Sequence, residues 1–200
     1  QIRLSVKMKF LVGLAREICE TIGTAKMPPV AEQLGRLAAE AAIIENLLYG
    51  MEANGSMHGD YYVPDRHAVY AAQTMTQGMY PQFITTMRAL AGGALIMLPS
   101  SAADYSDPEL SALFSAVQIA ADGRTPVERV KLMKLAWDAI GSEFASRHTQ
   151  YEMFYAGAQF VTRGHSFRTY DWAKAKSLVS TISDRYELAG SLAGAKQAAE

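Results

Sequence analysis

The sequence of 200 residues lacks most of what would tie it to a disulfide, a nucleic acid or a membrane. Its single cysteine, Cys19, can form no disulfide within the chain and cannot begin a cysteine-based metal site. The 19 basic residues balance 20 acidic ones, and no block of like charge indicates a nucleic-acid groove or a membrane-surface patch. No apolar run approaches the roughly 18 residues that span a bilayer. We therefore expect a cytoplasmic protein with no nucleic-acid and no membrane partner.

The motifs of common catalytic and metal sites are missing as well. The sequence has no Gly-x-Ser-x-Gly nucleophile motif and no glycine-rich phosphate loop of the Walker or dinucleotide type. Its four histidines are His58, His67, His148 and His165. They do not occur in the paired spacing of a metal site in a helical bundle, so we expect no metal site.

The sequence does contain a strong helical pattern. Half of the residues are hydrophobic, which is enough for a sizeable core. Two series of apolar residues, spaced alternately four and three apart, each predict one stripe of a helix. The series are Leu4, Met8, Leu11, Ala15, Ile18 and Ile22, then Val30, Leu34, Leu37, Ala41, Ile44, Leu48 and Met51. Pro28-Pro29 can start the second helix, and the short connection predicts an antiparallel pair. The predicted fold class is an all-α, antiparallel helical bundle.

The middle of the sequence predicts shorter elements. They are an exposed loop over 58–62, a helix over 64–77, a shorter helix over 81–90, and a buried loop or single strand over 94–98. We expect Gly78 and Pro81 to interrupt the helical pattern, because proline clashes with the carbonyl group four residues before it.

The second half of the sequence predicts three helices. The first runs from Asp107-Pro108 to about Ala120. The second begins at Thr125, which can form a capping box with Glu128, and ends near 147–148. Its predicted buried face is Val127, Val130, Met133, Trp137, Ile140 and Phe144. A loop through Gly157 and Gly164 then leads to a terminal helix over 171–200, which Asp171 caps.

Two turns that contain glycine could take part in binding. Gly92-Gly93 can stop a helix, or it can let a ligand phosphate approach the backbone closely, since neither residue has a Cβ atom. The segment 142–157 combines Arg147, which can pair with a phosphate, with several aromatic rings and the small pair Ala156-Gly157. A tyrosine-rich contact between helices, ending in a glycine turn, explains the same residues equally well.

Six stretches of the sequence carry a further signal. They are YVPDR at 62–66, MYP at 79–81, GGALIMLPS at 92–100, ERVK at 128–131, LAWDAIGSEF at 135–144 and RHxxYExxYAG at 147–157. In this order they resemble the C-terminal region of the 4-hydroxyphenylacetate 3-monooxygenase family. These are the oxygenase components of two-component aromatic hydroxylases that use reduced flavin. The resemblance covers residues 2 to about 160, and the last forty residues match weakly.

This resemblance implies a helical bundle like the C-terminal domain of acyl-CoA dehydrogenases. Residues 1–200 would then form one C-terminal domain for FAD binding and oligomerisation, a fragment of a longer chain that assembles into a dimer or tetramer. The resemblance implies an enzyme that receives reduced FAD, FADH2, from a separate flavin reductase. With O2 it would hydroxylate a phenol such as 4-hydroxyphenylacetate beside its hydroxyl group. Catalytic residues are expected in the missing N-terminal portion, so this fragment alone would be inactive.

The resemblance also implies which residues bind the cofactor. The turn Tyr155-Ala156-Gly157 resembles the segment that contacts FAD near its pyrophosphate, where family members commonly continue with Asn or Asp and this chain has Ala158. Gly92-Gly93 resembles a loop that approaches the cofactor closely and can do so across a subunit boundary. The expected cofactor-binding residues are Tyr155, Ala156, Gly157, Ala158, Arg147, Gly92 and Gly93.

Two other functions stay open on the sequence. One is a lyase like 4-hydroxybutyryl-CoA dehydratase, which has the same fold. Its iron–sulfur cluster needs several cysteine ligands, and Cys19 alone cannot supply them. The other is a non-catalytic helical oligomerisation module that has lost cofactor binding.

Overall fold

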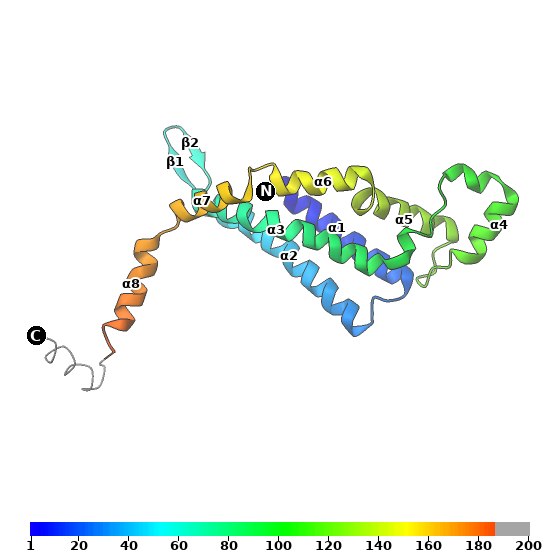
Figure 1. Ribbon diagram of the computed structural model, residues 1–200, viewed down its shortest axis with the longest axis horizontal. Coiled ribbons are helices and arrows are strands. Elements are labelled where there is room, and N and C mark those ends of the chain that lie inside the picture. Colours follow the sequence, from blue (N-terminus) through cyan, green and yellow to red (C-terminus); the bar gives the residue numbers. More distant parts are fainter. Residues whose placement is uncertain (187–200) are drawn as a thin grey trace, which may run out of the picture. The chain divides into compact units, whose positions relative to one another are not determined.

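The computed structural model describes residues 1–186, and the chain divides into two compact units, residues 1–166 and 167–200. The elements in chain order are α1 (Ile2–Ile22), α2 (Pro28–Ala53), β1 (Ser56–His58), β2 (Tyr61–Val63), α3 (Arg66–Ala91), the 3₁₀ turns η1 (Gly92–Leu95) and η2 (Ala102–Ser106), α4 (Pro108–Val117), α5 (Pro126–Ile140), α6 (Glu143–Phe154), α7 (Gln159–Thr169) and α8 (Trp172–Ser183). The predicted all-α, antiparallel bundle is confirmed (Figure 1). Within residues 1–186, no helix combines the length and the hydropathy needed to cross a membrane.

The helices α1 and α2 form the predicted antiparallel pair, and α3 lies beside both (Figure 1). The two predicted stripes supply much of the core, including Met8, Ile18 and Leu37, each of which is fully buried. Gly23 ends α1 in the left-handed conformation that L side chains rarely adopt, and prolines occupy the first turn of α2. Cys19 is buried within α1, and burial raises the pKa of its thiol.

The predicted break at Gly78 and Pro81 is wrong, because α3 runs without interruption from Arg66 to Ala91. An interior proline costs a helix about 3 kcal/mol. The same face of α3 buries Tyr80, Phe83 and Met87 in the core, and each such side chain contributes about 1.5–3 kcal/mol. Burial on both sides of Pro81 therefore outweighs the local preference of proline.

The segment expected to be an exposed loop at 58–62 is exposed but not irregular. It forms most of an antiparallel hairpin in which β1 pairs with β2, with Met57 opposite Tyr62 and His58 opposite Tyr61. Gly59 has a φ of +60°, and positive φ at the first position of a two-residue turn is typical of type II′ hairpins. The two-residue turn lets the flanking residues pair as strands.

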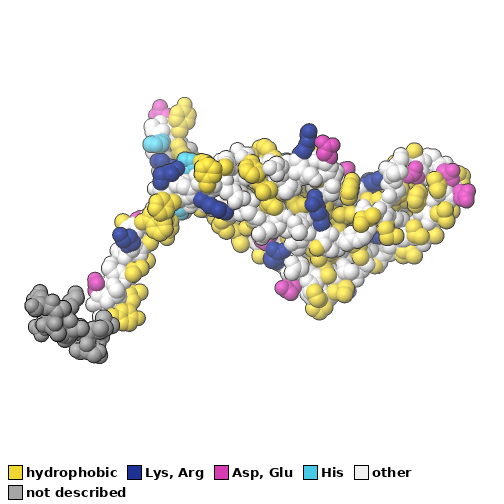
Figure 2. Space-filling view, viewed as in Figure 1, with side chains coloured by type: hydrophobic (Ala, Val, Ile, Leu, Met, Phe, Trp, Pro, Cys, Tyr) yellow, Lys and Arg dark blue, Asp and Glu magenta, His cyan; other side chains and the backbone are white. Residues whose placement is uncertain are grey.

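The expected buried loop or single strand at 94–98 is only partly right, because Leu95 is buried and residues 96–98 form a loop, but no strand is present there. Residues 92–95 form the η1 turn, and Ile96 and Met97 are 82% and 62% exposed. The helix α4 follows as expected but ends at Val117, three residues before the predicted end. Its apolar residues Leu113 and Val117 are exposed, and Figure 2 shows hydrophobic side chains at the α4 end of the bundle.

The helix that begins at Thr125 ends earlier than predicted. Gly141 follows α5, and Ser142 caps a separate helix, α6, by accepting a hydrogen bond from the Ala145 N–H at 3.2 Å. Arg147 and His148 therefore lie within a helix and not at its end. The predicted buried face is only partly right: Val130, Met133 and Ile140 are buried, whereas three other side chains are exposed. The exposed ones are Val127, Trp137 and Phe144.

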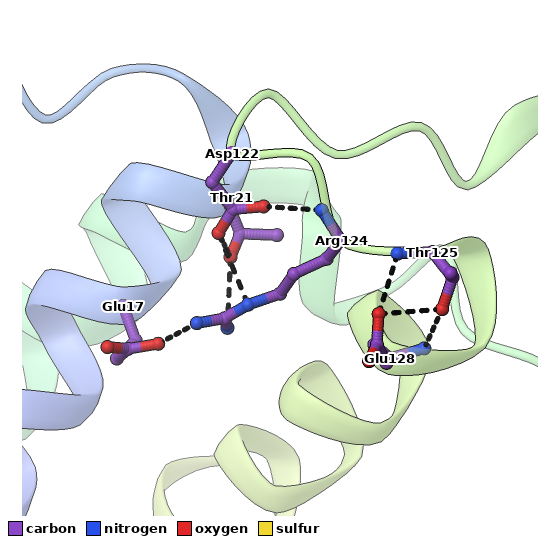
Figure 3. A network of polar contacts seen from close by, with 6 residues as sticks. All are labelled: Glu17, Thr21, Asp122, Arg124, Thr125 and Glu128. Atoms are coloured by element: carbon purple, nitrogen blue, oxygen red, sulfur yellow. Dashed lines mark hydrogen bonds and ion pairs between the residues drawn. The ribbon is translucent and has the colours of Figure 1, made fainter.

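The capping box at Thr125 is confirmed, and a second polar network joins the preceding loop to α1 (Figure 3). The Thr125 hydroxyl accepts from the Glu128 N–H, and the Glu128 carboxylate accepts from the Thr125 N–H at 2.8 Å. Arg124 pairs with Glu17 of α1 and with Asp122, whose carboxylate also accepts from the Thr21 hydroxyl at 2.8 Å. These contacts fix the start of α5 against α1.

The loop predicted through Gly157 and Gly164 contains a further helix, α7. Its sequence has no apolar stripe, which is the reason that periodicity missed it. In the second unit, Asp171 caps α8 as predicted, accepting from the Lys174 N–H at 2.9 Å. This helix ends at Ser183 and not at residue 200, and residues 187–200 of the predicted terminal helix lie outside the described residues.

Candidate cofactor-binding turn

The turn that joins α6 to α7 has an open backbone. Its tightest bend is closed by the Gly157 N–H, which donates to the Phe154 carbonyl at 2.9 Å. Gly157 has a φ of +110°, in the region that favours glycine. A Cβ atom placed on it would meet no atom within 4 Å, so the space beside this backbone is free. A ligand group could therefore approach the turn closely.

The first turn of α7 follows at once and has no side-chain cap. The Ala158 carbonyl accepts from the N–H groups of Val161 and Thr162, which gives Ala158 the position that starts the helix. The first N–H groups of a helix lack acceptors within that helix, and the alanine side chain offers none. The N–H groups of Gln159 and Phe160 can therefore serve an anion, which the positive end of the helix dipole also favours.

Two buried polar side chains hold this turn against the bundle. Gln77 of α3 is 1% exposed, and its Nε2 donates to the Gly157 carbonyl at 2.7 Å. The buried hydroxyl of Thr162 in α7 donates to Gln77 Oε1, also at 2.7 Å. Sequence spacing gives no signal for Gln77, because its partners lie some 80 residues away in the chain.

A group of charged and aromatic side chains from α6 and from the start of α1 lies beside the turn. Glu152 of α6 is 1% exposed and pairs with Lys7 and, at 2.9 Å, with Arg3. The Arg3 guanidinium lies 4.8 Å from the centre of the Tyr151 ring and 5.6 Å from that of Tyr155. The two tyrosine rings stack with their centres 5.2 Å apart. Arg3 thus fixes the ring of Tyr155, the first residue of the turn.

Burial shifts the pKa values of this group. Desolvation lowers the pKa of Lys7, although Glu152 opposes this shift. Burial and then the charge of Glu152 raise the pKa of Tyr80 to about 12. Burial, and then the Lys7 ammonium, lower the pKa of His148 from its ordinary 6.5. Arg3 and Lys7 therefore share the Glu152 carboxylate beside an imidazole whose neutral form burial favours.

The other sequence-predicted residues do not join the turn within the described chain. The side chain of Arg147 is 79% exposed and pairs with Glu143, 3.4 Å away on the same helix. Gly92 ends α3, roughly 22 Å along the helix from Gln77 at about 1.5 Å per residue. A pocket of about 350 Å³ adjoins that end of α3, lined by Leu95, Ile96, Leu98, Pro99, Ser100, Lys134 and Trp137. The structure thus brings together Tyr155, Ala156, Gly157 and Ala158 and leaves the other three apart.

The side chains that hold the turn were not found from the sequence. Arg3 and Lys7 are one turn apart on α1, and this spacing alone reads as a solvent-exposed helix face. Glu152 lies in the RHxxYExxYAG stretch, but its position gave no indication of burial. Contacts between distant parts of the chain define these roles, and a local pattern does not contain them.

The helical bundle has an acyl-CoA dehydrogenase-like fold. The chain belongs to the 4-hydroxyphenylacetate 3-hydroxylase C-terminal family, whose model matches residues 1–184. The 4-hydroxyphenylacetate 3-monooxygenase oxygenase component of Pseudomonas aeruginosa is 34% identical over 167 residues, covering 83% of this chain and 32% of that protein. The chain thus spans about a third of the length of the curated relatives it matches.

Solved structures show the same fold. A crystal structure of the oxygenase component of 4-hydroxyphenylacetate 3-monooxygenase, complexed with FAD and 4-hydroxyphenylacetate, has a TM-score of 0.83 at 24% identity. The alignment covers 89% of this chain and 37% of the chain in that crystal structure. An archaeal 4-hydroxybutyryl-CoA dehydratase from N. maritimus has a TM-score of 0.79 at 17% identity, covering 92% of this chain and 37% of that one. The two structures share the fold of this chain.

Proposed function

We propose that this chain is the C-terminal domain of a two-component monooxygenase, which uses reduced FAD and O2 to hydroxylate a phenol beside its hydroxyl group. The observation that carries the proposal is the family match over residues 1–184, together with the open turn at Gly157. The relatives of this family include oxygenase components that act on 4-hydroxyphenylacetate, and we propose a phenol of this kind as substrate. The groups that hold the phenol then belong to the two thirds of the relatives' length that this chain does not span.

The residues of the turn suit the diphosphate of FAD. A diphosphate needs hydrogen-bond donors and space close to the backbone, and the turn has both at Gly157 and at the start of α7. Tyr155 and Arg3 lie beside it and can add an aromatic face and a positive charge. Bound reduced FAD would supply the electrons with which O2 is activated. The role of this domain is to bind the phosphates of the cofactor, and the rest of the enzyme binds the flavin ring.

The distance between the turn and Gly92 supports an assembly of more than one copy. We propose that Gly92, Gly93 and Arg147 contact the cofactor of a neighbouring subunit or of another part of the full-length chain, in a homodimer or homotetramer. Such closed assemblies are common among soluble oligomers. A separate flavin reductase would deliver the reduced FAD, and we place both components in the cytoplasm, which suits the unpaired, buried Cys19.

The two alternatives have less support. A dehydratase-like lyase would need several cluster ligands, and the one cysteine of this chain is buried in α1. A purely structural module would have no use for an open left-handed turn held by two buried side chains. Neither alternative accounts for the family match as well as the monooxygenase does.

A pair of glycine variants in the full-length protein tests the proposal. Gly157 and Gly123 both have left-handed backbones, at φ +110° and +84°, and a Cβ atom on either would meet nothing within 4 Å. Leucine at either position therefore strains the backbone similarly, but only Gly157→Leu reaches the proposed diphosphate. We expect Gly157→Leu to weaken FAD binding by at least about tenfold, or 1.4 kcal/mol, and Gly123→Leu to leave it unchanged.

The flavin titration separates two kinds of failure. Full-length protein that binds no FAD at all would contradict the proposed function. Wild-type affinity in Gly157→Leu would contradict the assignment of the turn, while leaving the function to other residues.

A further inference from the structure

Gln77 has an unusual position for a glutamine. It lies on the buried face of α3, is 1% exposed, and its amide makes a 2.7 Å hydrogen bond at each end. Its partners belong to the turn and to α7, and both lie some 80 residues further along the chain. A buried amide with both ends hydrogen-bonded favours one geometry, because any arrangement that leaves one end unpaired carries the full desolvation penalty of that group.

The two partners fix which way the amide faces. The Gly157 carbonyl can only accept a hydrogen bond, so the NH2 group of Gln77 must face it. The Thr162 hydroxyl then donates to Oε1 on the other side. Glutamate has no N–H for the carbonyl, and methionine, of similar size, can satisfy neither partner. Only a glutamine of this length meets both demands at once.

Fixing the Gly157 carbonyl also fixes the next N–H group. The carbonyl of Gly157 and the N–H of Ala158 belong to one peptide unit, which is planar and trans, since residues 1–186 contain no cis peptide bond. The two groups of a trans peptide point in opposite directions. With its carbonyl held toward Gln77, this peptide directs the Ala158 N–H away from Gln77.

We propose that Gln77 is the positioning residue that gives the turn its preference for a flavin dinucleotide over a flavin mononucleotide. The inference rests on the proposed function, in which this turn binds the FAD diphosphate. Gln77 does not touch the cofactor. It holds the Ala158 N–H and, through Thr162, the first turn of α7 in the orientation that a diphosphate bridge requires. FMN ends at a single phosphate and lacks the second phosphate of the bridge, so its binding depends less on this orientation.

The test measures the affinities of reduced FAD and reduced FMN, under anaerobic conditions, for full-length wild-type protein and three variants. The variants are Gln77→Met, Thr162→Val and Gln82→Met. Gln82 lies on an exposed position of the same helix and receives the same substitution, so it serves as the matched control. We expect Gln77→Met to weaken FAD binding at least about tenfold and FMN binding less than twofold.

Thr162→Val keeps the bond from Gln77 to the Gly157 carbonyl and removes the Thr162 hydroxyl, which lies 2.7 Å from Gln77 Oε1 and 3.0 Å from the Gln159 carbonyl oxygen. It should weaken FAD binding by an intermediate factor, about threefold, again without affecting FMN. This milder variant keeps the test usable if Gln77→Met fails to fold, and melting temperatures identify that case. Gln82→Met should bind both flavins like the wild type.

The outcomes are distinct. A selective loss of FAD affinity supports the proposal. Equal losses for FAD and FMN would give Gln77 a structural role alone and overturn it, as would unchanged affinities in both Gln77→Met and Thr162→Val. Wild-type protein that binds neither flavin would overturn the proposed function itself, whatever the variants do.

Discussion

At the residue scale, the charges beside the turn share one carboxylate. Glu152 is buried and serves both Lys7 and Arg3, so removing it would leave two cations beside aromatic rings without an acid. Lys7 is partly buried and Arg3 is about half exposed, so the loss of Glu152 would destabilise the fold mainly by leaving the Lys7 ammonium partly desolvated without its carboxylate. Since Glu152 is on α6 and both cations are on α1, the cluster ties α6, which leads into the turn, to α1.

His148 belongs to the same cluster and predicts a pH dependence of stability. Five groups face it: Arg3 and Lys7 from α1, and Glu152 and the rings of Phe144 and Tyr151 from α6. Burial and Lys7 lower its pKa in the folded protein, whereas the unfolded chain binds the proton near pH 6.5. Between these two pKa values the unfolded state holds more protons, so stability falls as the pH drops below 6.5.

Urea unfolding of the 200-residue chain at several values of pH from 7.5 to 5 checks this dependence. We expect the wild type to lose stability over this range relative to His148→Gln, whose side chain does not titrate. Parallel curves for the two proteins would show that His148 contributes nothing to the pH dependence.

At the element scale, the sequence pattern predicted helices where one face is apolar over several turns. The stripes of α1 and α2 and the capping box of α5 are local features, and all three appear in the structure. The continuity of α3 through Pro81 depends on core contacts made by Tyr80 and Phe83, which no local rule contains. The short polar helix α7 depends on Thr162 and its partner Gln77, so periodicity could not find it.

The same distinction holds for the candidate site. Tyr155, Ala156, Gly157 and Ala158 are consecutive, so a resemblance in sequence could select them together. Arg147 was selected because arginine can pair with a phosphate, and Gly92 was selected by resemblance to a loop that approaches the cofactor; the structure places both away from that turn. Gln77, Arg3 and Lys7 come from other helices and needed the fold.

The missing cap of α7 gives a prediction for this element. Asparagine at an N-cap can accept from the free N–H groups of the first helical turn, and Ala158 cannot. We expect Ala158→Asn to raise the free energy of unfolding by about 1 kcal/mol. If the added amide also anchors the diphosphate, FAD should bind about 2- to 10-fold more tightly to the full-length protein, as one net hydrogen bond allows.

Ala156→Asn is the matched control, because it adds the same side chain to the turn without occupying the N-cap. Thermal unfolding checks the stability and flavin titration checks the affinity. A stability gain equal to that of the control would show that position 158 does not cap α7.

At the scale of the whole molecule, the bundle buries one hydrophobic core but leaves many apolar side chains exposed on its surface. Most of the core residues belong to α1, α2, α3 and α5. Among the helices α1 to α6, only α4 has no buried residue. By contrast, Ile96, Met97 and the apolar residues of α4 are exposed. Exposed apolar residues of this number favour partners, which the proposal supplies as further subunits or the rest of a longer chain.

This imbalance predicts a domain that folds but does not catalyse. Supplied with NADH, a flavin reductase, FAD and 4-hydroxyphenylacetate, the 200-residue chain should form no dihydroxy product, because it spans about a third of its relatives' length and the proposal assigns the phenol-binding groups to the remainder. Circular dichroism should show the helical content of a folded bundle in the same sample, so that inactivity does not reflect unfolding. The full-length protein is the positive control under identical conditions. Dihydroxy product from the 200-residue chain, measured by chromatography, would place the catalytic groups within the bundle and contradict their assignment to the rest of the enzyme.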